Sequence, residues 1–289
     1  MKPLKFALFF VLILTVTLLS FRPANNVTKM VFIRGGTFMM GLDSAGLSHS
    51  IKRFNLPADS FLYEAPAVRV TVLPFYIDKV DVTNAEFKKF IKANPQWTKG
   101  HIPDSLQDGN YLKDWHGDNY PKGQQEFPVT YVSFYAANAY ARWLGKRLPT
   151  EAEWEYVAKG LKHSFITYSW GDENISPNAA NYATSNRRQI GKTGNFAPND
   201  LGVYDITGNV YQFCMDRWRP DEYVKMHDYS KKKLLHPINT AQPNTVTIRG
   251  GSWIDEAQKL RITYRQGYPI NKCSPYVGFR CASNAEKSH

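Results

Sequence analysis

Apolar and polar residues alternate along residues 68–78, which predicts a half-buried β-strand, and the mostly apolar residues 30–40 are also expected to form a strand. Gly35 and Gly36 interrupt residues 30–40, so we expect a strand broken by a turn there. Three other segments, residues 83–93, 133–144 and 150–159, carry apolar side chains at helical spacing.

Helix boundaries are marked by residues that satisfy free backbone groups. Thr83 is expected to cap the first helix, and Thr150 with Glu153 forms a capping box at the third. Gly145 and Gly160 are expected to end the second and third helices. Residues 94–127 are rich in polar and aromatic residues and are expected to form a long loop. Short strands and turns are expected after residue 160. The chain is therefore predicted to be α+β and loop-rich.

The residue pattern at the N-terminus is typical of an exported protein. Lys2 and Lys5 precede an apolar run over residues 6–19, which is long enough for a signal peptide and short for a membrane span. No small-x-small cleavage site follows, so an uncleaved anchor remains the alternative. We expect residues 1–25 to be a signal peptide or N-terminal anchor and residues 26–289 to form the folded domain, in the periplasm or cell envelope.

Composition and charge exclude several classes of protein. The 289 residues are 43% hydrophobic and 21% charged, which excludes general disorder and a multi-span membrane protein. The net charge is +11, but the basic residues are scattered and no nucleic-acid-binding motif occurs, so a nucleic-acid partner is not expected. The cysteines are Cys214, Cys273 and Cys281, without a CxxC pair, and the odd count leaves at least one thiol unpaired.

A series of motifs resembles the formylglycine-generating enzyme (sulfatase-modifying factor) family. The most specific is Gly145 to Tyr156, GKRLPTEAEWEY. The others, in chain order, are Arg34 to Gly41, Asp81 to Asn84, Phe127-Pro128-Val129, Trp170-Gly171, Asn199 to Asp205, Gly208-Asn209-Val210, Arg249 to Trp253 and Gly278 to Cys281. The resemblance spans residues 31–282 and implies one compact domain related to the C-type lectin fold.

The resemblance also implies where the family's chemistry would lie. Its oxidases use copper and two cysteines after the GGSW motif, but residues 254–265 here contain no cysteine, and Asp255 stands at the first position. A carboxylate is a poor Cu(I) ligand, so we expect no copper. Ser252, Arg265 and Tyr211 match other active-site positions and, with Asp255, are the candidate catalytic residues; the alternative is that they only hold the fold.

Two calcium sites are implied by the same resemblance. The first would use Asp205, the carbonyls of Gly208 and Val210, and Gln212, where the family has an acid; Gln still offers an oxygen. The second would use Asn181 and the carbonyl of Tyr182, but its acidic loop is replaced by residues 185–188, so its occupancy is doubtful. The family disulfide to Cys281 should be absent because its usual partner position is Ala141. Pairing of Cys281 with Cys273 or Cys214 stays open.

Three functions remain open on this evidence. The first is a pseudoenzyme that binds or scaffolds a protein or glycan in the cell envelope, like the gliding-motility and secretion lipoproteins of the family; the aromatic loop at residues 94–125 would be its contact surface. The second is an enzyme with cysteine-independent chemistry at the family cleft. The third is a divergent sulfatase activator. The absence of the cysteines favours the first.

Overall fold

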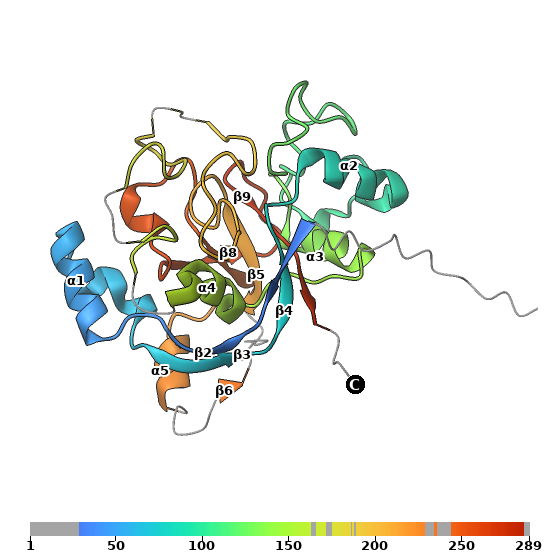
Figure 1. Ribbon diagram of the computed structural model, residues 1–289. Helices are drawn as coiled ribbons and strands as arrows, with labels where there is room; N and C mark the ends of the chain where they lie inside the picture. The colour runs from blue at the N-terminus through green and yellow to red at the C-terminus, as the bar shows by residue number, and fades with distance from the viewer. Residues whose placement is uncertain are drawn as a thin grey trace, which may run out of the picture.

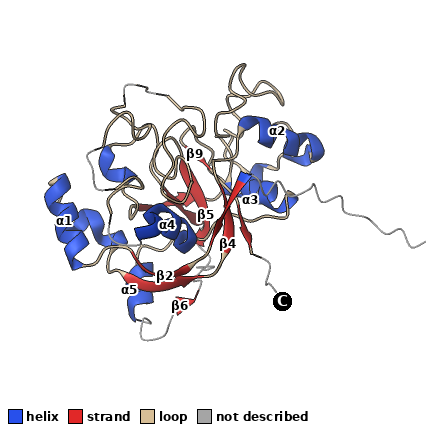
Figure 2. Cartoon of the chain, viewed as in Figure 1, coloured by secondary structure: helices blue, strands red, loops and turns tan. Residues whose placement is uncertain are grey.

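The computed structural model describes residues 29–162, 166–171, 175–185, 187, 189–228, 234–235 and 244–285. Three small sheets lie at the centre, with α2 and α3 packed at one end of the molecule and α1 at the other (Figure 1). Loops and turns connect most of these elements (Figure 2). The predicted loop-rich α+β class is therefore confirmed.

The described helices are short. They are α1 (Ser44–Phe54), α2 (Asn84–Ala93), α3 (Phe134–Trp143), α4 (Glu151–Lys159) and α5 (Glu222–Asp228). Short 3₁₀ segments lie at Ala58–Glu64, Pro95–Trp97, Asp104–Leu106, Gly160–Lys162 and Ala257–Leu260. The strands are β1 (Met30–Ile33), β2 (Gly36–Met40), β3 (Val68–Val72), β4 (Phe75–Asp78), β5 (Tyr211–Arg217), β6 (Leu234–Leu235), β7 (Thr245–Arg249), β8 (Arg265–Pro269), β9 (Val277–Gly278) and β10 (Ala282–Asn284).

The sheets join segments that are far apart in the sequence. Their strand orders are β1-β4-β10, β2-β3-β6 and β8-β7-β5-β9. The outer strands of the first sheet pair antiparallel with β4, which brings the first described strand and the last one to the same partner. In the four-stranded sheet β5 pairs antiparallel with β7 and parallel with β9.

The helix caps agree with the sequence prediction. Thr83 and Thr150 each accept a hydrogen bond from the backbone of a glutamate three residues later, and each glutamate side chain bonds back to the cap. Ser133 caps α3 through a bond from the Ala136 amide. These bonds satisfy amides that a helix start leaves free.

Other predictions were incomplete or wrong. Residues 68–78 were predicted as one strand, but Leu73 and Pro74 separate β3 from β4, which belong to different sheets. Proline lacks an amide to donate to a ladder, so the chain changes sheets there. Helix α1 was not predicted, although Asp43 caps it and accepts a bond from Gly46. Helix α5 was not predicted either.

Aromatic side chains fill the core beneath α2 and α3. Phe87 stacks on Tyr140 with ring centroids 5.8 Å apart and meets Phe90 at 5.3 Å. Trp115, from the long loop after α2, packs edge-on against Phe87 and is 5% exposed. Part of the aromatic loop thus closes over the core.

Helix α4 carries a buried cluster of charged side chains. The Glu151 carboxylate accepts two bonds from Arg265, at 2.6 and 2.8 Å, and one from Arg249 at 3.1 Å. Glu155, one helical turn later, accepts from Arg249 at 2.5 Å and lies 3.1 Å from Lys159. Burial raises the pKa of Glu155, but the charges of Lys159 and Arg249 outweigh it and hold the pKa below its usual value.

Within the described ranges, no helix is long and apolar enough to cross a membrane. The apolar run over residues 6–19, on which the export prediction rests, lies outside them. The predicted signal peptide or anchor stays a prediction.

Replacing Arg249 should destabilise the fold strongly, because two buried glutamates would lose a cationic partner. We expect Arg249→Met to lower the free energy of unfolding by about 3–5 kcal/mol. Lys192→Met is the control, since its pair with Glu126 is more than half exposed and should contribute less than about 1 kcal/mol. Urea unfolding of both variants tests this; equal losses would contradict a structural role for the cluster.

Candidate functional site

Two glycines at the end of β7 shape the turn that carries the candidate site. Gly250 and Gly251 have φ values of +103° and +69°. A Cβ on Gly250 would lie 2.9 Å from the carbonyl oxygen of Ile206, and one on Gly251 would lie 2.9 Å from that of Lys259. Only glycine fits both the backbone angles and the space. The turn brings Ser252 into the interior, where it is fully buried.

Ser252 and Asp255 are bonded to each other. The Ser252 hydroxyl donates to Oδ2 of Asp255, and the Lys259 ammonium lies 3.1 Å from Oδ1. Burial lowers the pKa of Lys259, but its bond to Asp255 and the charge of that carboxylate outweigh burial and raise the pKa. The Ser252 hydroxyl therefore donates its proton to the Asp255 carboxylate, whose charge is balanced by Lys259.

Tyr211 belongs to the same group. Its hydroxyl is buried and has no hydrogen-bond partner among the described residues. Burial, followed by the negative charge of Asp255 and the proximity of Tyr264, raises the pKa of Tyr211. It therefore stays protonated beside Asp255.

Arg265, the fourth candidate catalytic residue, is committed elsewhere. It binds Glu151 through two nitrogens, and its guanidinium lies 4.5 Å from the ring centre of Trp218 and 4.4 Å from that of Tyr223. Its other bonds go to the carbonyls of Tyr63 and Arg219. The structure thus groups Ser252, Asp255 and Tyr211, and places Arg265 in the cluster under α4.

A groove of about 150 Å³ lies beside Trp253, the residue after Ser252. Its lining includes the aromatic residues Trp115, Tyr131 and Trp253, and Asp114 is its one carboxylate. The rest of the lining is Asn84, Pro121, Gln124, Pro128, Thr130, Gln189, Ile190 and Pro275. The sequence analysis expected a contact surface on the loop at residues 94–125, which carries Trp115, but missed Tyr131 and Trp253 as groove residues.

Asn209 joins two walls of this groove. Its side chain accepts from the Gly191 amide at 2.9 Å and donates to the Gly191 carbonyl at 3.2 Å. Its own carbonyl accepts from the Trp253 amide at 3.0 Å. The Gly208-Asn209-Val210 motif therefore fixes the Gln189–Ile190 wall against Trp253.

The first predicted calcium site fits its residues poorly. The Gln212 side-chain oxygen already accepts from Trp154 at 2.7 Å and from Arg280 at 2.9 Å, and its amide nitrogen donates to the Asp205 carbonyl. One Asp205 carboxylate oxygen accepts from Gly194 at 2.5 Å, and the other has no hydrogen-bond partner among the described residues. Gln212 thus has no free lone pair in the carbonyl plane to offer a cation.

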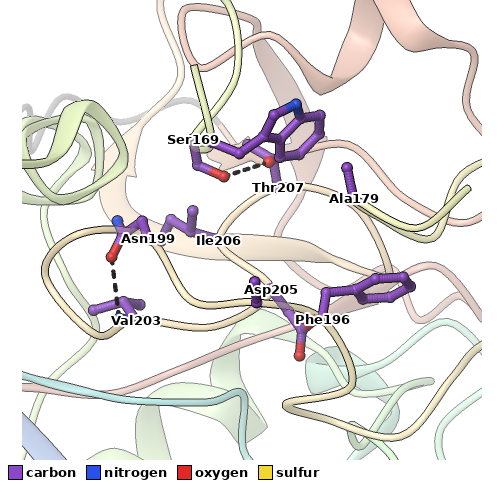
Figure 3. Close-up of a pocket in the computed structure, with 10 residues that line it drawn as sticks. Ser169, Ala179, Phe196, Asn199, Val203, Asp205, Ile206 and Thr207 are labelled. Carbon is purple, nitrogen blue, oxygen red and sulfur yellow. Dashed lines mark hydrogen bonds between the residues drawn. The ribbon is translucent and has the colours of Figure 1, made fainter. Parts of the chain in front are cut away.

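Asp205 also borders a cavity of about 10 Å³, roughly the space for one water molecule. Figure 3 shows the cavity between the Ser169–Thr207 hydroxyl pair and Asn199, whose oxygen accepts from the Val203 amide. Trp170 lines the cavity too, and its indole nitrogen lacks a partner among the described residues.

The oxygens of the second predicted calcium site are likewise used. Asn181 accepts from the Ser185 hydroxyl at 3.0 Å, and the Tyr182 carbonyl accepts from the Ser185 amide at 3.0 Å. A serine turn therefore satisfies both predicted ligands. Among the described residues, no three or more His, Cys, Asp or Glu side chains gather as a metal cluster would.

All three cysteines are free and buried. Neither of the two pairings left open by the sequence is present. Burial, ahead of nearby negative charges, raises the pKa of all three thiols, so they are protonated at neutral pH.

Comparison with known proteins decides the family. The model of the sulfatase-modifying factor enzyme 1-like domain matches residues 15–285. The chain belongs to this family. It is similar to the formylglycine-generating enzyme of Streptomyces coelicolor, with 30% identity and 91% of each chain covered. It is as similar to the inactive C-alpha-formylglycine-generating enzyme 2 of Bos taurus, at 30% identity and 90% of each.

The chain is also similar to part of a longer protein and to a protein of known structure. The serine/threonine-protein kinase pkn1 of Chlamydia pneumoniae is 30% identical over 91% of this chain, which spans only 39% of the kinase. Among solved structures, PvdO from Pseudomonas aeruginosa has a TM-score of 0.64 at 25% identity, covering 89% of this chain and 94% of PvdO. The family prediction is confirmed, and the relation to C-type lectins stays a prediction.

Asp81, in the Asp81-Val82-Thr83-Asn84 motif, generates a pH prediction. Burial, opposed by Arg280 and assisted by Asp205, raises its pKa from 3.8 to about 7. The folded state then holds a proton that the unfolded chain releases between pH about 4 and about 7, so stability falls as pH rises through that window. The slope is at most about 1.4 kcal/mol per pH unit.

Asp81→Asn should remove this dependence. Its stability relative to the wild type is expected to improve steadily from pH 4 to pH 7 (roughly the window set by the two pKa values) and then level off. Thermal unfolding across that range measures it, with the exposed Asp118→Asn as control. Parallel profiles for Asp81→Asn and wild type would show that the carboxyl is ionised throughout.

Proposed function

We propose that this chain is an exported, non-catalytic member of the family that binds a neutral glycan of the cell envelope in the groove beside Trp253. The observation that carries the proposal is the lining of that groove, which includes three aromatic residues, residues with uncharged amides and one carboxylate. Export rests on the N-terminal apolar run.

The size and surface of the groove suit a single sugar ring. A cavity of about 150 Å³ accommodates one six-membered ring. Aromatic faces contact the C–H face of a pyranose, while Asp114, Gln124 and Gln189 offer hydrogen-bonding groups to its hydroxyls. Asp114 is also the only ionisable side chain of the lining other than tyrosine, so sulfated or phosphorylated ligands are disfavoured.

The groove is held in shape by bonds within the chain. Lys99 donates to the carbonyls of Lys113 and Trp115, at 3.0 and 2.7 Å, and fixes the loop that carries Asp114. The Tyr131 backbone accepts from Leu112 and donates to Ser274, which ties Tyr131 both to that loop and to the segment before Pro275. A preformed site loses less conformational entropy on binding, so a small ligand gains affinity.

The chemistry of the candidate catalytic residues supports a binding role. The Ser252 hydroxyl is fully buried and bonded to Asp255, and neither residue lines the groove. A nucleophile has to reach a substrate and pass its proton to a base. The described thiols are buried and protonated, and so unsuited to hold Cu(I) as thiolates.

Binding of neutral hexopyranose methyl glycosides and short neutral oligosaccharides, measured by calorimetry, tests the proposal. For whichever sugar binds, Tyr131→Ala should weaken affinity at least about fivefold, since an aromatic anchor contributes 1 kcal/mol or more. Asp114→Asn should weaken it about tenfold through loss of a charged acceptor.

Matched controls separate the groove from general effects. Tyr76→Ala removes a half-buried tyrosine on β4, and Asp118→Asn an exposed aspartate of the same loop that lies outside the groove lining. Both should bind like the wild type. Absence of binding to any neutral sugar, together with binding of a peptide, would replace the glycan with a protein partner. Turnover of a sulfatase-derived cysteine peptide that is lost in Ser252→Ala would overturn the non-catalytic role.

A further inference from the structure

We propose that the outward face of the first four strands rests on an anionic membrane surface, to which the N-terminal apolar run tethers the domain. The proposal rests on the same apolar run as the proposed export, and it is independent of the glycan groove. It is carried by the exposed apolar side chains of this face, by its charge and by the short stretch of chain before β1.

The four strands form one bent ribbon, in which β1 pairs with β4 and β2 pairs with β3 (Figure 1). Both halves of the ribbon bury side chains in the same hydrophobic cluster, together with Trp154 and Val157 of α4. Successive side chains of a strand point to opposite faces, so the intervening ones point away from this cluster. The ribbon therefore has one face in the core and one at the surface of the molecule.

The surface face of the ribbon carries apolar side chains in contact with solvent. Phe32 on β1 is 51% exposed, Leu73 in the turn between β3 and β4 is 46% exposed, and Met39 on β2 is 40% exposed. Phe32 also packs against Tyr76 of β4, with ring centroids 5.2 Å apart. Exposed apolar side chains that gather on one face mark an interaction surface, and aromatic rings are favoured at the interface between lipid and water.

The charge of the ribbon fits a negatively charged surface. Residues 29–40 and 68–79 contain one acid, Asp78, and four basic residues, Lys29, Arg34, Arg69 and Lys79. All four basic residues are exposed. Asp78 is buried and its carboxylate lies 2.7 Å from the Lys146 ammonium, so it adds no exposed negative charge. Anionic lipid headgroups attract such cations, while the apolar side chains between them enter the headgroup layer.

The sequence keeps this face close to a membrane that holds the apolar run. The run ends at residue 19 and β1 begins at Met30, two residues before Phe32. Residues 20–28 are nine residues, and a chain of that length spans at most about 32 Å. Of the exposed apolar residues, Phe32 is thus the nearest in sequence to the tether, and the ribbon is the surface that the tether presents to the lipid.

Fluorescence of the full chain bound to lipid vesicles tests the proposal. Leu73→Cys, labelled with the polarity-sensitive fluorophore NBD, reports on the ribbon face. Leu161→Cys, labelled in the same way, is the control, because Leu161 is 65% exposed in the turn after α4. The three native cysteines are buried, so the introduced thiol reacts first.

On vesicles of phosphatidylglycerol and phosphatidylcholine, we expect NBD emission at position 73 to shift to the blue and to be quenched by brominated lipid. Emission at position 161 should stay unchanged. Adding Arg69→Gln to the labelled Leu73→Cys chain should lower the ratio of docked to undocked domain about fivefold, because one cation near the surface is lost.

Three results would overturn the proposal. They are a chain that stays in solution, a bound chain whose emission at position 73 is unchanged, and equal shifts at positions 73 and 161. Calorimetry of the same labelled variants with the neutral glycosides keeps the two proposals apart. Loss of docking with intact sugar binding would overturn the membrane contact alone, and docking without sugar binding would overturn the glycan site alone.

Discussion

The ion pairs between α4 and the four-stranded sheet are the interaction on which the rest of the structure depends. Glu151 and Glu155 lie one helical turn apart and both bind Arg249, the last residue of β7. Arg265, the first residue of β8, binds Glu151 as well. Buried charges are costly unless they are paired, so the helix has one favourable position against these two strands.

That position determines where the Gly250-Gly251 turn lies. Arg249 immediately precedes the turn, and Trp154 of α4 would lie 3.3 Å from a Cβ on Gly250. This turn places Ser252 in the interior and Trp253 in the lining of the groove. Asn209 then attaches the Gln189–Ile190 wall, through side-chain bonds to Gly191 and a backbone bond from Trp253.

The sequence predicted the elements that local chemistry defines. Helices α2 and α4 were recognised because Thr83 and Thr150 satisfy free amides within their own first turns. Helix α1 was missed because only Leu47, Ile51 and Phe54 mark its apolar face, and Gly46 weakens the pattern. The break at Pro74 was visible in the sequence, yet the change of sheet depends on pairing with β1 and β10, which are distant in the chain.

The site was less predictable than the fold. Ser252, Asp255 and Tyr211 do lie together, as the sequence analysis expected. Nothing local in the sequence showed that Arg265 would bind Glu151 and lie apart from these three residues. Glu151 and Glu155 both belong to the GKRLPTEAEWEY motif, but the sequence analysis used that motif only to identify the family and a helix. The bonds of Arg280 were not predictable either, since most of its partners are backbone carbonyls from distant segments.

The central claim is that a sugar ring occupies the groove beside Trp253 without rearrangement of the fold. The indole N–H signals of the seven tryptophans in ¹H–¹⁵N spectra test it most directly. On titration with a neutral glycoside, the signals of Trp253 and Trp115 should shift, while that of the fully buried Trp154 should not. Unchanged signals at Trp253 and Trp115 under saturating ligand would contradict the claim.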